Sequence, residues 1–438
     1  MNLVSHQINT MSGEILCPGD KSISQRILII GSILNCDMEI DGFLDSADPN
    51  STLNALNEIG ASIKKEQEKV YLSKRHIPFN EPINDLDLGN SGTGARLILG
   101  LISGLGLRSK LVGDSSLSNR PMLRVIKPLI QMGAKIDYSK GTLPIFTIDS
   151  KITNNFTYEM PIASAQVKSC LLLAAIAAEK NIKIIEPKIT RDHTERMIDY
   201  FGGDINFGKK ENNIREIDYK FNNLTPKDSY KVPGDFSSAS FIIVATLISS
   251  HSEVLIRNVG LNKTRSGLLK VLKLMGANIQ ITNQKMESNE EVGDIIVKSS
   301  KLSGIDVPEN IIPNIIDEIP ILSIAAAFAE GVTKISNASE LRVKESDRLN
   351  ALSNGLTKLN INHEIFQDGI NITGTKEKIE PKEIIDSFDD HRIAMSFLVA
   401  GIKSKKGILV KNCKNIETSF PNFKNIMNSL GMKIDEKN

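Results

Sequence analysis

Apolar residues recur along the chain at helical spacing, and these stretches end in a common way. An apolar helical stripe is followed by Gly, then by one or two small or polar residues, and then by Ile. The pattern occurs at 53–63, 125–136, 197–205, 268–279 and 426–434, and in a degenerate form, with Asn360 in place of Gly, at 351–361. A glycine at a helix end is typical of a left-handed C-cap. The six copies predict an internally repeated α/β architecture, with three units in each half of the chain.

Short β-like apolar runs lie between the predicted helices. They span 145–148, 182–185, 254–256, 294–297 and 408–410, and their length and composition predict strands. Helix–Gly–strand joints occur in any α/β protein, but their near-regular spacing here favours a repeat. We therefore expect two similar domains of three β/α units each, with the active cleft between them and a short hinge near 233–235.

The sequence Pro-Gly-Asp occurs twice, at 18–20 and at 233–235, and a long apolar stretch follows each copy. Each copy predicts a turn, an Asp or Ser cap and a buried helix. The first copy alone carries cations, Lys21 and Arg26, and Ser22 shares a helix face with Arg26. Such a helix start suits a carboxylate or a phosphate, although a routine solvated cap explains these residues equally well.

Bulk composition narrows the class of protein. A chain of 438 residues is long enough for two domains, and a net charge of +1 gives no global attraction to nucleic acid or to a membrane surface. The longest apolar runs are too short to span a bilayer, and residues 1–10 do not resemble a signal peptide. The four cysteines are widely separated, without zinc-site spacing, which favours reduced, buried thiols in a cytoplasmic enzyme.

Polar and charged side chains gather at the predicted helix starts. The segment 88–96 reads LGNSGTGAR, and its glycines allow a ligand to approach the backbone closely. Ser164 and Gln166 open an apolar helix and suit a polyhydroxy ligand. Further motifs are Asn119-Arg120, the segment 191–196, Asp317-Glu318, the segment 341–348 and the segment 389–392.

Each motif also has an ordinary structural interpretation. The segment 191–196 is favoured as a capping box in a solvated charged turn, and 341–348 is compatible with a charge-paired surface helix. Asp389-Asp390-His391 has no second histidine-bearing partner motif, so we predict no metal site. Together, however, cations at capped helix starts in nearly every unit predict a site for small, strongly anionic substrates. Asp317 and Glu345 would supply proton transfer there.

The motifs resemble those of the EPSP synthases (3-phosphoshikimate 1-carboxyvinyltransferases), in particular their class II bacterial branch. The strings LGNSGTGARL, NRPM, SAQVKS, TRDHTE, LRVKESDRL and DHRIAMSF occur in the order of that family. The resemblance implies an inverse α/β prism, in which each of two domains contains three β-α-β-α-β-β units. One domain would comprise residues 21–234, and the other residues 1–20 together with 235–438.

The resemblance also implies a reaction. The enolpyruvyl group of phosphoenolpyruvate would pass to the 5-hydroxyl of shikimate-3-phosphate by addition and elimination, in the shikimate pathway to aromatic amino acids. No metal and no organic cofactor is implied. We expect a cytoplasmic monomer whose partners are these two small molecules, with neither nucleic acid nor membrane involved.

Roles for individual residues follow from the same resemblance. Asp317 would accept the proton of the attacking hydroxyl, and Glu345 with Lys21 would manage the proton on the enolpyruvyl methylene. The residues implied to bind shikimate-3-phosphate are Lys21, Ser22, Arg26, Ser164, Gln166, Arg191, Asp317 and Lys344. Those implied to bind phosphoenolpyruvate are Lys21, Gly92, Arg120, Gln166, Arg348 and Arg392. Gly92 also predicts sensitivity to glyphosate, because a methyl group there would crowd the phosphoenolpyruvate site. Another branch differs at Glu340 and Thr418, so contacts of those two positions are not carried over.

Two alternative functions stay open from the sequence. The sister enolpyruvyl transferase that acts on UDP-N-acetylglucosamine typically has Lys-Asn in place of Lys21-Ser22, and a reactive loop cysteine. A non-catalytic anion-binding scaffold would have no need of Asp317 and Glu345.

Overall fold

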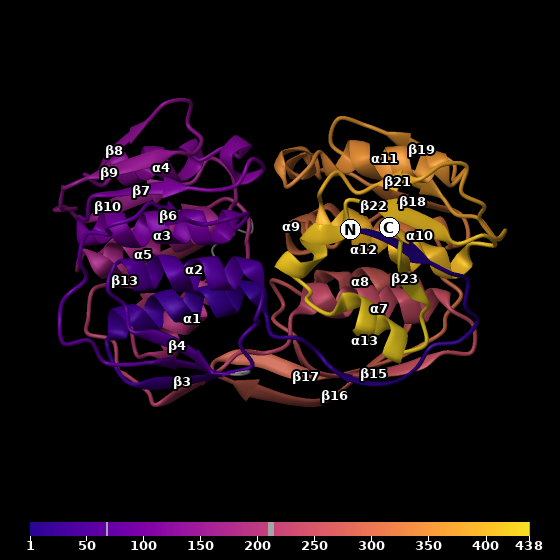
Figure 1. Cartoon of the computed structure of the whole chain (residues 1–438), viewed down its shortest axis with the longest axis horizontal. Helices are drawn as coiled ribbons and strands as arrows, with labels where there is room; N and C mark the ends of the chain where they lie inside the picture. The colour runs from indigo at the N-terminus through magenta and orange to yellow at the C-terminus, as the bar shows by residue number, and fades with distance from the viewer. Residues whose placement is uncertain (67–68, 209–213, 438) are drawn as a thin grey trace. The chain divides into compact units, whose positions relative to one another are not determined.

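The computed structural model describes residues 1–66, 69–208 and 214–437 (Figure 1). The chain divides into two compact units. The terminal unit comprises Met1–Pro18, Gly234–Lys285 and Glu291–Asn438, and the central unit comprises Gly19–Pro233 and Met286–Glu290. The chain therefore leaves the terminal unit after Pro18 and returns to it at Gly234.

The central unit contains three copies of one β-α-β-α-β-β arrangement. The copy that is contiguous in sequence from residue 86 consists of β6 (Leu86–Asp87), α3 (Gly92–Leu105), β7 (Ser109–Val112), α4 (Leu123–Gln131), β8 (Lys135–Tyr138) and β9 (Ile145–Ile148). Its sheet order is β6-β7-β9-β8. β6 pairs with β7 in parallel, whereas β9 is antiparallel to both of its neighbours.

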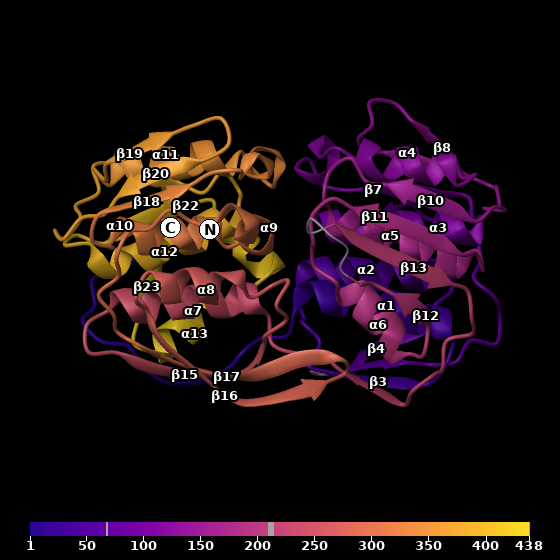
Figure 2. The ribbon, with the colours of Figure 1, turned by 180° about the vertical axis from the view of Figure 1, so that it is seen from behind.

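The other two copies in the central unit follow the same plan. The next along the chain, seen in Figure 2, consists of β10 (Phe156–Glu159), α5 (Ala165–Ala177), β11 (Ile182–Glu186), α6 (His193–Tyr200), β12 (Asp204–Asn206) and β13 (Arg215–Lys220). The first copy consists of α1 (Lys21–Leu34), β3 (Met38–Asp41), α2 (Ala47–Glu58), β4 (Ile63–Glu66), β5 (Lys69–Leu72) and, from the far end of the unit, β14 (Ser229–Lys231). β14 pairs with β3 in parallel and thus completes a sheet that begins about two hundred residues earlier.

The terminal unit repeats the arrangement, except that the sheet of its second copy has three strands, β18-β20-β19. Its first copy consists of β2 (Ser12–Leu16), α7 (Phe236–Ile248), β15 (Glu253–Gly260), α8 (Gly267–Leu274), β16 (Asn278–Glu287) and β17 (Glu290–Lys298). Its second consists of α10 (Ile319–Ala327), β18 (Val332–Ile335), α11 (Arg348–Lys358), β19 (His363–Ile365) and β20 (Ile370–Thr373), preceded by the short helix α9 (Ile312–Ile315). Its third consists of β21 (Ile385–Asp386), α12 (His391–Ala400), β22 (Ile408–Lys411), α13 (Phe423–Ser429), β23 (Ile434–Lys437) and β1 (Asn2–Ser5). Because β1 lies between β22 and β23, the N-terminal strand closes the last repeat.

The left-handed helix ends predicted from sequence are confirmed. The φ angles are +93° at Gly60, +109° at Gly133, +73° at Gly202, +92° at Gly276, +105° at Gly431 and +57° at Asn360. Each of these residues lies between one of the outer helices, α2, α4, α6, α8, α11 and α13, and the strand that follows it. The predicted strands are confirmed as well, at β9, β11, β15, β17 and β22. The α/β repeat is therefore present in all six copies.

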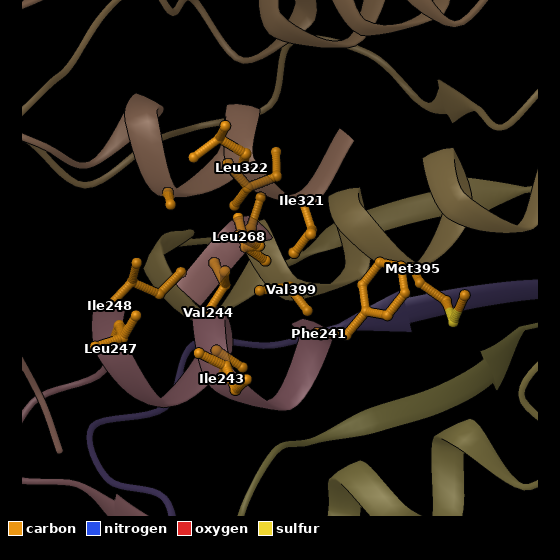
Figure 3. Packing of buried hydrophobic residues seen from close by; sticks show 14 of the residues in the cluster. Phe241, Ile243, Val244, Leu247, Ile248, Leu268, Ile321, Leu322, Met395 and Val399 are labelled. Atoms are coloured by element: carbon orange, nitrogen blue, oxygen red, sulfur yellow. The ribbon is translucent and has the colours of Figure 1, made fainter. Parts of the chain in front are cut away.

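Each unit buries its inner helices in a core of its own. In the terminal unit, side chains of α7 such as Phe241 and Val244 pack with Leu322 of α10 and Val399 of α12 (Figure 3). In the central unit, α3 and α5 approach so closely that a Cβ added to Gly100 would lie 2.3 Å from the carbonyl oxygen of Cys170. The inner helices of each unit are therefore packed tightly against one another.

Two sequence interpretations need correction. Residues 341–348 do not form one surface helix, because a 3₁₀ turn covers Ser339–Val343, Lys344 is extended, and α11 begins only at Arg348. The segment 191–196 is not solvated, since His193, Thr194 and Glu195 are all buried. The tip of the β16–β17 hairpin, which belongs to the central unit, places Glu290 Oε1 2.7 Å from His193 Nδ1. The N-cap residue Asp192 makes no capping hydrogen bond with its side chain.

Candidate active site

The first turns of α1, α3 and α5 lie together in the central unit. Gln25 on α1 donates to the hydroxyl of Ser91, the N-cap of α3, at 2.6 Å. Gln166 on α5 donates to the hydroxyl of Thr93 on α3 at 2.9 Å. Three helix N-termini with their backbone N–H groups are thus joined by side-chain hydrogen bonds, which is an arrangement suited to anions.

The first Pro-Gly-Asp forms the cap that its sequence predicts. Asp20 accepts from the backbone N–H of Ile23 at 2.8 Å, and Lys21 Nζ lies 2.8 Å from Asp48 Oδ2. Arg26 is buried and donates to the hydroxyls of Thr194 at 2.8 Å and Ser169 at 3.0 Å. Its Nη1 also donates to the carbonyl of Ser22, at 2.9 Å. The predicted residues Lys21, Ser22 and Arg26 therefore share one helix start.

Arg26 stands in an unusual electrostatic environment. Burial lowers its pKa to about 10, against the opposing effect of the carboxylates of Asp20 and Glu195, and the nearby charge of Arg191 lowers the pKa further. Arg191 is therefore close enough to Arg26 for their charges to interact. A doubly anionic group bound between them would relieve this repulsion.

Arg120, Gly92 and Gln166 form a second group, together with Arg96. Arg96 Nη1 donates to the carbonyl of Gly92 at 3.0 Å and to Gln166 Oε1 at 2.9 Å. Arg120 Nη2 donates to Asn90 Oδ1 at 2.7 Å. A Cβ on Gly92 would lie 2.9 Å from Nη1 of both arginines. The glycine thus leaves space immediately beside two guanidinium groups.

Ser164 is the N-cap of α5 and lies two residues before Gln166. Its hydroxyl accepts from the backbone N–H of Val167, although at 3.4 Å this bond is long. The eight sequence-predicted residues of the central unit, Lys21, Ser22, Arg26, Gly92, Arg120, Ser164, Gln166 and Arg191, are therefore carried by α1, by α3, by α5 and by the segments before α4 and α6.

In the terminal unit, Arg348 is the centre of a cluster of carboxylates. Its Nε donates to Asp390 Oδ2 at 2.8 Å, its Nη1 to Asp317 Oδ1 at 3.1 Å, and its Nη2 to Glu345 Oε2 at 2.5 Å. Lys344 Nζ lies 3.4 Å from the same oxygen of Asp317. Burial would lower the pKa of Arg348, but the carboxylates of Asp390, Glu345 and Asp317 outweigh it and raise the pKa above its ordinary value.

Arg392 lies at the start of α12 and is held mainly by its Nη1 atom. This nitrogen donates to the carbonyl of Asp317 at 2.8 Å and to the hydroxyl of Ser237 at 2.9 Å, and lies 3.3 Å from Glu318 Oε1. The five sequence-predicted residues of the terminal unit, Asp317, Lys344, Glu345, Arg348 and Arg392, therefore belong to one connected network.

The chain was next compared with known proteins. A family model described as EPSP synthase (3-phosphoshikimate 1-carboxyvinyltransferase) matches residues 5–427. A Petrotoga mobilis protein named 3-phosphoshikimate 1-carboxyvinyltransferase is 47% identical over 424 residues, which are 96% of this chain and 97% of that protein. The chain belongs to the EPSP synthase family.

Further EPSP synthases agree with this assignment. One from Legionella pneumophila (strain Lens), with the same name as the Petrotoga protein, is 44% identical over 438 residues, 100% of this chain and 99% of its own. The solved structure of the Acinetobacter baumannii EPSP synthase superposes with a TM-score of 0.85 at 38% identity, and each chain is covered completely. The enolpyruvyl transferase NikO from Streptomyces tendae, at 15% identity and a TM-score of 0.78, shares the fold.

Several residues of the two networks were not assigned a role from the sequence. Arg96, Glu318 and Asp390 belong to quoted motifs, and the spacing of Arg96 four residues after Gly92 could have identified it. Asp48 pairs with Lys21, which is 27 residues away. Arg265 donates from Nη1 to Glu318 Oε1 at 2.9 Å, across 53 residues. Neither residue has a local signal in the sequence, because its partner is so distant along the chain.

The described residues contain no group of three or more His, Cys, Asp and Glu side chains that could hold a metal ion. Over the same ranges, no single helix is long and apolar enough to cross a membrane. The helical segments 309–315 and 319–327 satisfy those criteria only as a pair bent by 116°.

Proposed function

We propose that the protein catalyses the reaction that names its family. It transfers the enolpyruvyl group of phosphoenolpyruvate to the 5-hydroxyl of shikimate-3-phosphate and releases phosphate. The main support is full-length similarity to proteins named for this activity. The two networks add chemical support, because one gathers arginines at helix starts and the other combines arginines with carboxylates.

In the proposed mechanism, the central unit mainly binds anions. Arg26 and Arg191, with Ser22, Ser164 and Gln166, hold the phosphate and ring of shikimate-3-phosphate. Arg120 and the backbone at Gly92 take up part of phosphoenolpyruvate, and Lys21 serves both substrates. Guanidinium groups suit these ligands because they form charge-assisted, bidentate hydrogen bonds to phosphate and carboxylate.

The terminal unit supplies proton transfer in this mechanism. Glu345, with Lys21, delivers a proton to the methylene carbon of phosphoenolpyruvate, which leaves C2 cationic. The 5-hydroxyl oxygen adds to C2, and its proton passes to Asp317. The tetrahedral intermediate then expels phosphate while Glu345, now a carboxylate, takes a proton back from the methyl group, which restores the carbon–carbon double bond. Lys344 lies beside Asp317 and would bind the hydroxyls of the same ring.

Arg348 suggests how substrate binding prepares this step. All three of its nitrogens donate to carboxylates, so a ligand anion competes with these carboxylates for the guanidinium group. Glu345 is the most exposed of the three, at 20% for its side chain. We propose that phosphoenolpyruvate displaces Glu345 from Nη2, which frees this carboxyl group beside the methylene. Glu345→Gln should then lower kcat strongly without raising KM for phosphoenolpyruvate, and a rise in KM with unchanged kcat would contradict the exchange.

The deciding experiment is phosphate release from phosphoenolpyruvate in the purified protein. Release should require shikimate-3-phosphate and should not occur with UDP-N-acetylglucosamine. None of the four cysteines is exposed, and Cys17, Cys170 and Cys413 are buried, which disfavours the sister enzyme with its reactive loop cysteine. Tight calorimetric binding of both substrates without any phosphate release would instead favour a non-catalytic scaffold.

We also propose that the enzyme acts as a monomer in the cytoplasm. The four free cysteines are consistent with a reducing compartment. Sedimentation velocity on the full chain tests the oligomeric state, and a dimer at micromolar concentration would refute this part of the proposal.

A further inference from the structure

The second Pro-Gly-Asp segment, 233–235, takes no part in the mechanism above. It is nevertheless connected to Arg392 by hydrogen bonds through Ser237. Asp235 caps α7 by accepting from the backbone N–H of Ser237 at 2.7 Å. The hydroxyl of Ser237 accepts from Arg392 Nη1 at 2.9 Å and donates to Glu318 Oε1. This copy of the motif, which carries no cation of its own, therefore holds an arginine that comes from α12.

Glu318 is the counter-ion at the centre of this arrangement. The residue is fully buried, and its Oε1 accepts from Arg265 Nη1 at 2.9 Å in addition to Ser237 and Arg392. Asp235 accepts from the same arginine, Arg265, at 3.3 Å. A buried carboxylate is costly unless cations and donors compensate it. The guanidinium groups of Arg265 and Arg392 compensate the charge of Glu318. Glu318 in turn compensates the charges of both arginines, which are buried in the same unit.

The way Arg392 is anchored leaves part of its guanidinium available. Its contacts with Ser237, Glu318 and the carbonyl of Asp317 all use Nη1. Neither Nε nor Nη2 of Arg392 donates to another of the residues that the structure describes. Together Nε and Nη2 form an edge that can pair with a carboxylate or phosphate through two parallel hydrogen bonds.

We propose that Glu318, together with Ser237, is a positioning residue that directs this edge of Arg392 toward phosphoenolpyruvate. The inference rests on the role of Arg392 in the proposed function. Glu318 touches no reacting atom and acts only by fixing Nη1. Without its charge, Arg265 and Arg392 repel each other, and the guanidinium of Arg392 is free to rotate.

Steady-state kinetics of Glu318→Gln test this proposal, because the substitution keeps the size of the side chain and removes its charge. We expect KM for phosphoenolpyruvate to rise about tenfold or more, and KM for shikimate-3-phosphate to change less than about twofold. Asp235→Asn is the matched control: it removes one charge from the same cluster and still caps α7. The hydrogen bonds that the Arg392 side chain makes within the described residues go to Ser237, Glu318 and the carbonyl of Asp317, and not to Asp235. The KM of this control variant for phosphoenolpyruvate should stay within about twofold of the original value.

A double-mutant cycle tests whether Glu318 acts through Arg392. Added to Arg392→Lys, Glu318→Gln should raise KM by less than about twofold, because the group that it positions is already altered. Full additivity of the two substitutions, or an Asp235→Asn effect as large as that of Glu318→Gln, would overturn the proposal. Ser237→Ala provides a second variant should Glu318→Gln fail to fold, and an unchanged KM for phosphoenolpyruvate in it would equally contradict the positioning.

Crystal structures of the unsubstituted protein and of Glu318→Gln give a readout that does not depend on turnover. In Glu318→Gln, the guanidinium of Arg392 should leave the carbonyl of Asp317, and an unmoved guanidinium would refute the proposal. If the unsubstituted enzyme releases no phosphate, the proposed reaction is wrong, but the positioning of Arg392 by Glu318 is not thereby refuted. The crystallographic comparison still decides how Arg392 is held.

Discussion

The substitution Gly92→Ala tests the space beside the arginines of the central unit. A Cβ at this position would lie 2.9 Å from Nη1 of Arg96 and of Arg120, whereas ordinary contact begins at 3.4 Å. Each guanidinium must therefore retreat by about 3.4 − 2.9 = 0.5 Å. Both groups are the far ends of flexible side chains, so the free energy of unfolding should change by less than about 1 kcal/mol.

The effect on binding should be larger than the effect on stability. A shift of this size stretches the hydrogen bonds from Arg96 to Gln166 and from Arg120 to Asn90, which measure 2.9 and 2.7 Å. Weakening one charge-assisted bond costs about 1 kcal/mol, which corresponds to about a fivefold fall in kcat/KM for phosphoenolpyruvate. Glyphosate, if it occupies the same space, should inhibit the variant less than the original protein.

Phosphate release at varied phosphoenolpyruvate concentration, with and without glyphosate, measures both effects. Gly31→Ala is the control, because it adds a methyl group to another inner helix, where the nearest atom is Cδ2 of Leu72 at 2.7 Å. It should leave kcat/KM unchanged. Equal kcat/KM and equal glyphosate inhibition in Gly92→Ala and the original protein would refute the reasoning.

Three further outcomes are expected. Gly100→Ala should lower the free energy of unfolding, measured by urea denaturation, by about 1–2 kcal/mol. The added Cβ would lie 2.3 Å from a backbone oxygen of α5, and this overpacking outweighs the gain in helix propensity. A stability equal to that of Gly31→Ala would contradict this expectation. Asp317→Ala and Lys21→Ala should each abolish phosphate release while the urea midpoint stays nearly unchanged, and a normal rate in either would remove its assigned role. Burial raises the pKa of Cys413 to about 12, and it also raises the pKa of Cys170. An aromatic disulfide reagent at pH 8 should therefore modify at most Cys36 in the native protein, and all four cysteines in denaturant. Rapid modification of several thiols in the native protein would show that these sites are open.

Much of the architecture could be predicted because its signals are local. The apolar spacing of the outer helices, the glycine at the end of each and the β-branched run that follows depend only on neighbouring residues. Asp20 and Asp235 cap their helices as their sequence context indicates. The residues that bear the family resemblance were identified for the same reason, since they form short continuous motifs.

Long-range pairing decided the rest. No local pattern shows that β14 joins β3, or that β1 lies between β22 and β23, because strand partners are chosen by the whole fold. The charged segments 191–196 and 341–348 suited solvated structure equally well, and only tertiary packing buries Glu195 and Arg348. Glu318 is similar: in the sequence it merely precedes an apolar run, whereas the structure surrounds it with arginines from two other segments. Sequence alone determined which elements form and which family they resemble, and tertiary structure determined which charges meet, because burial and ion pairing depend on residues far apart in the chain.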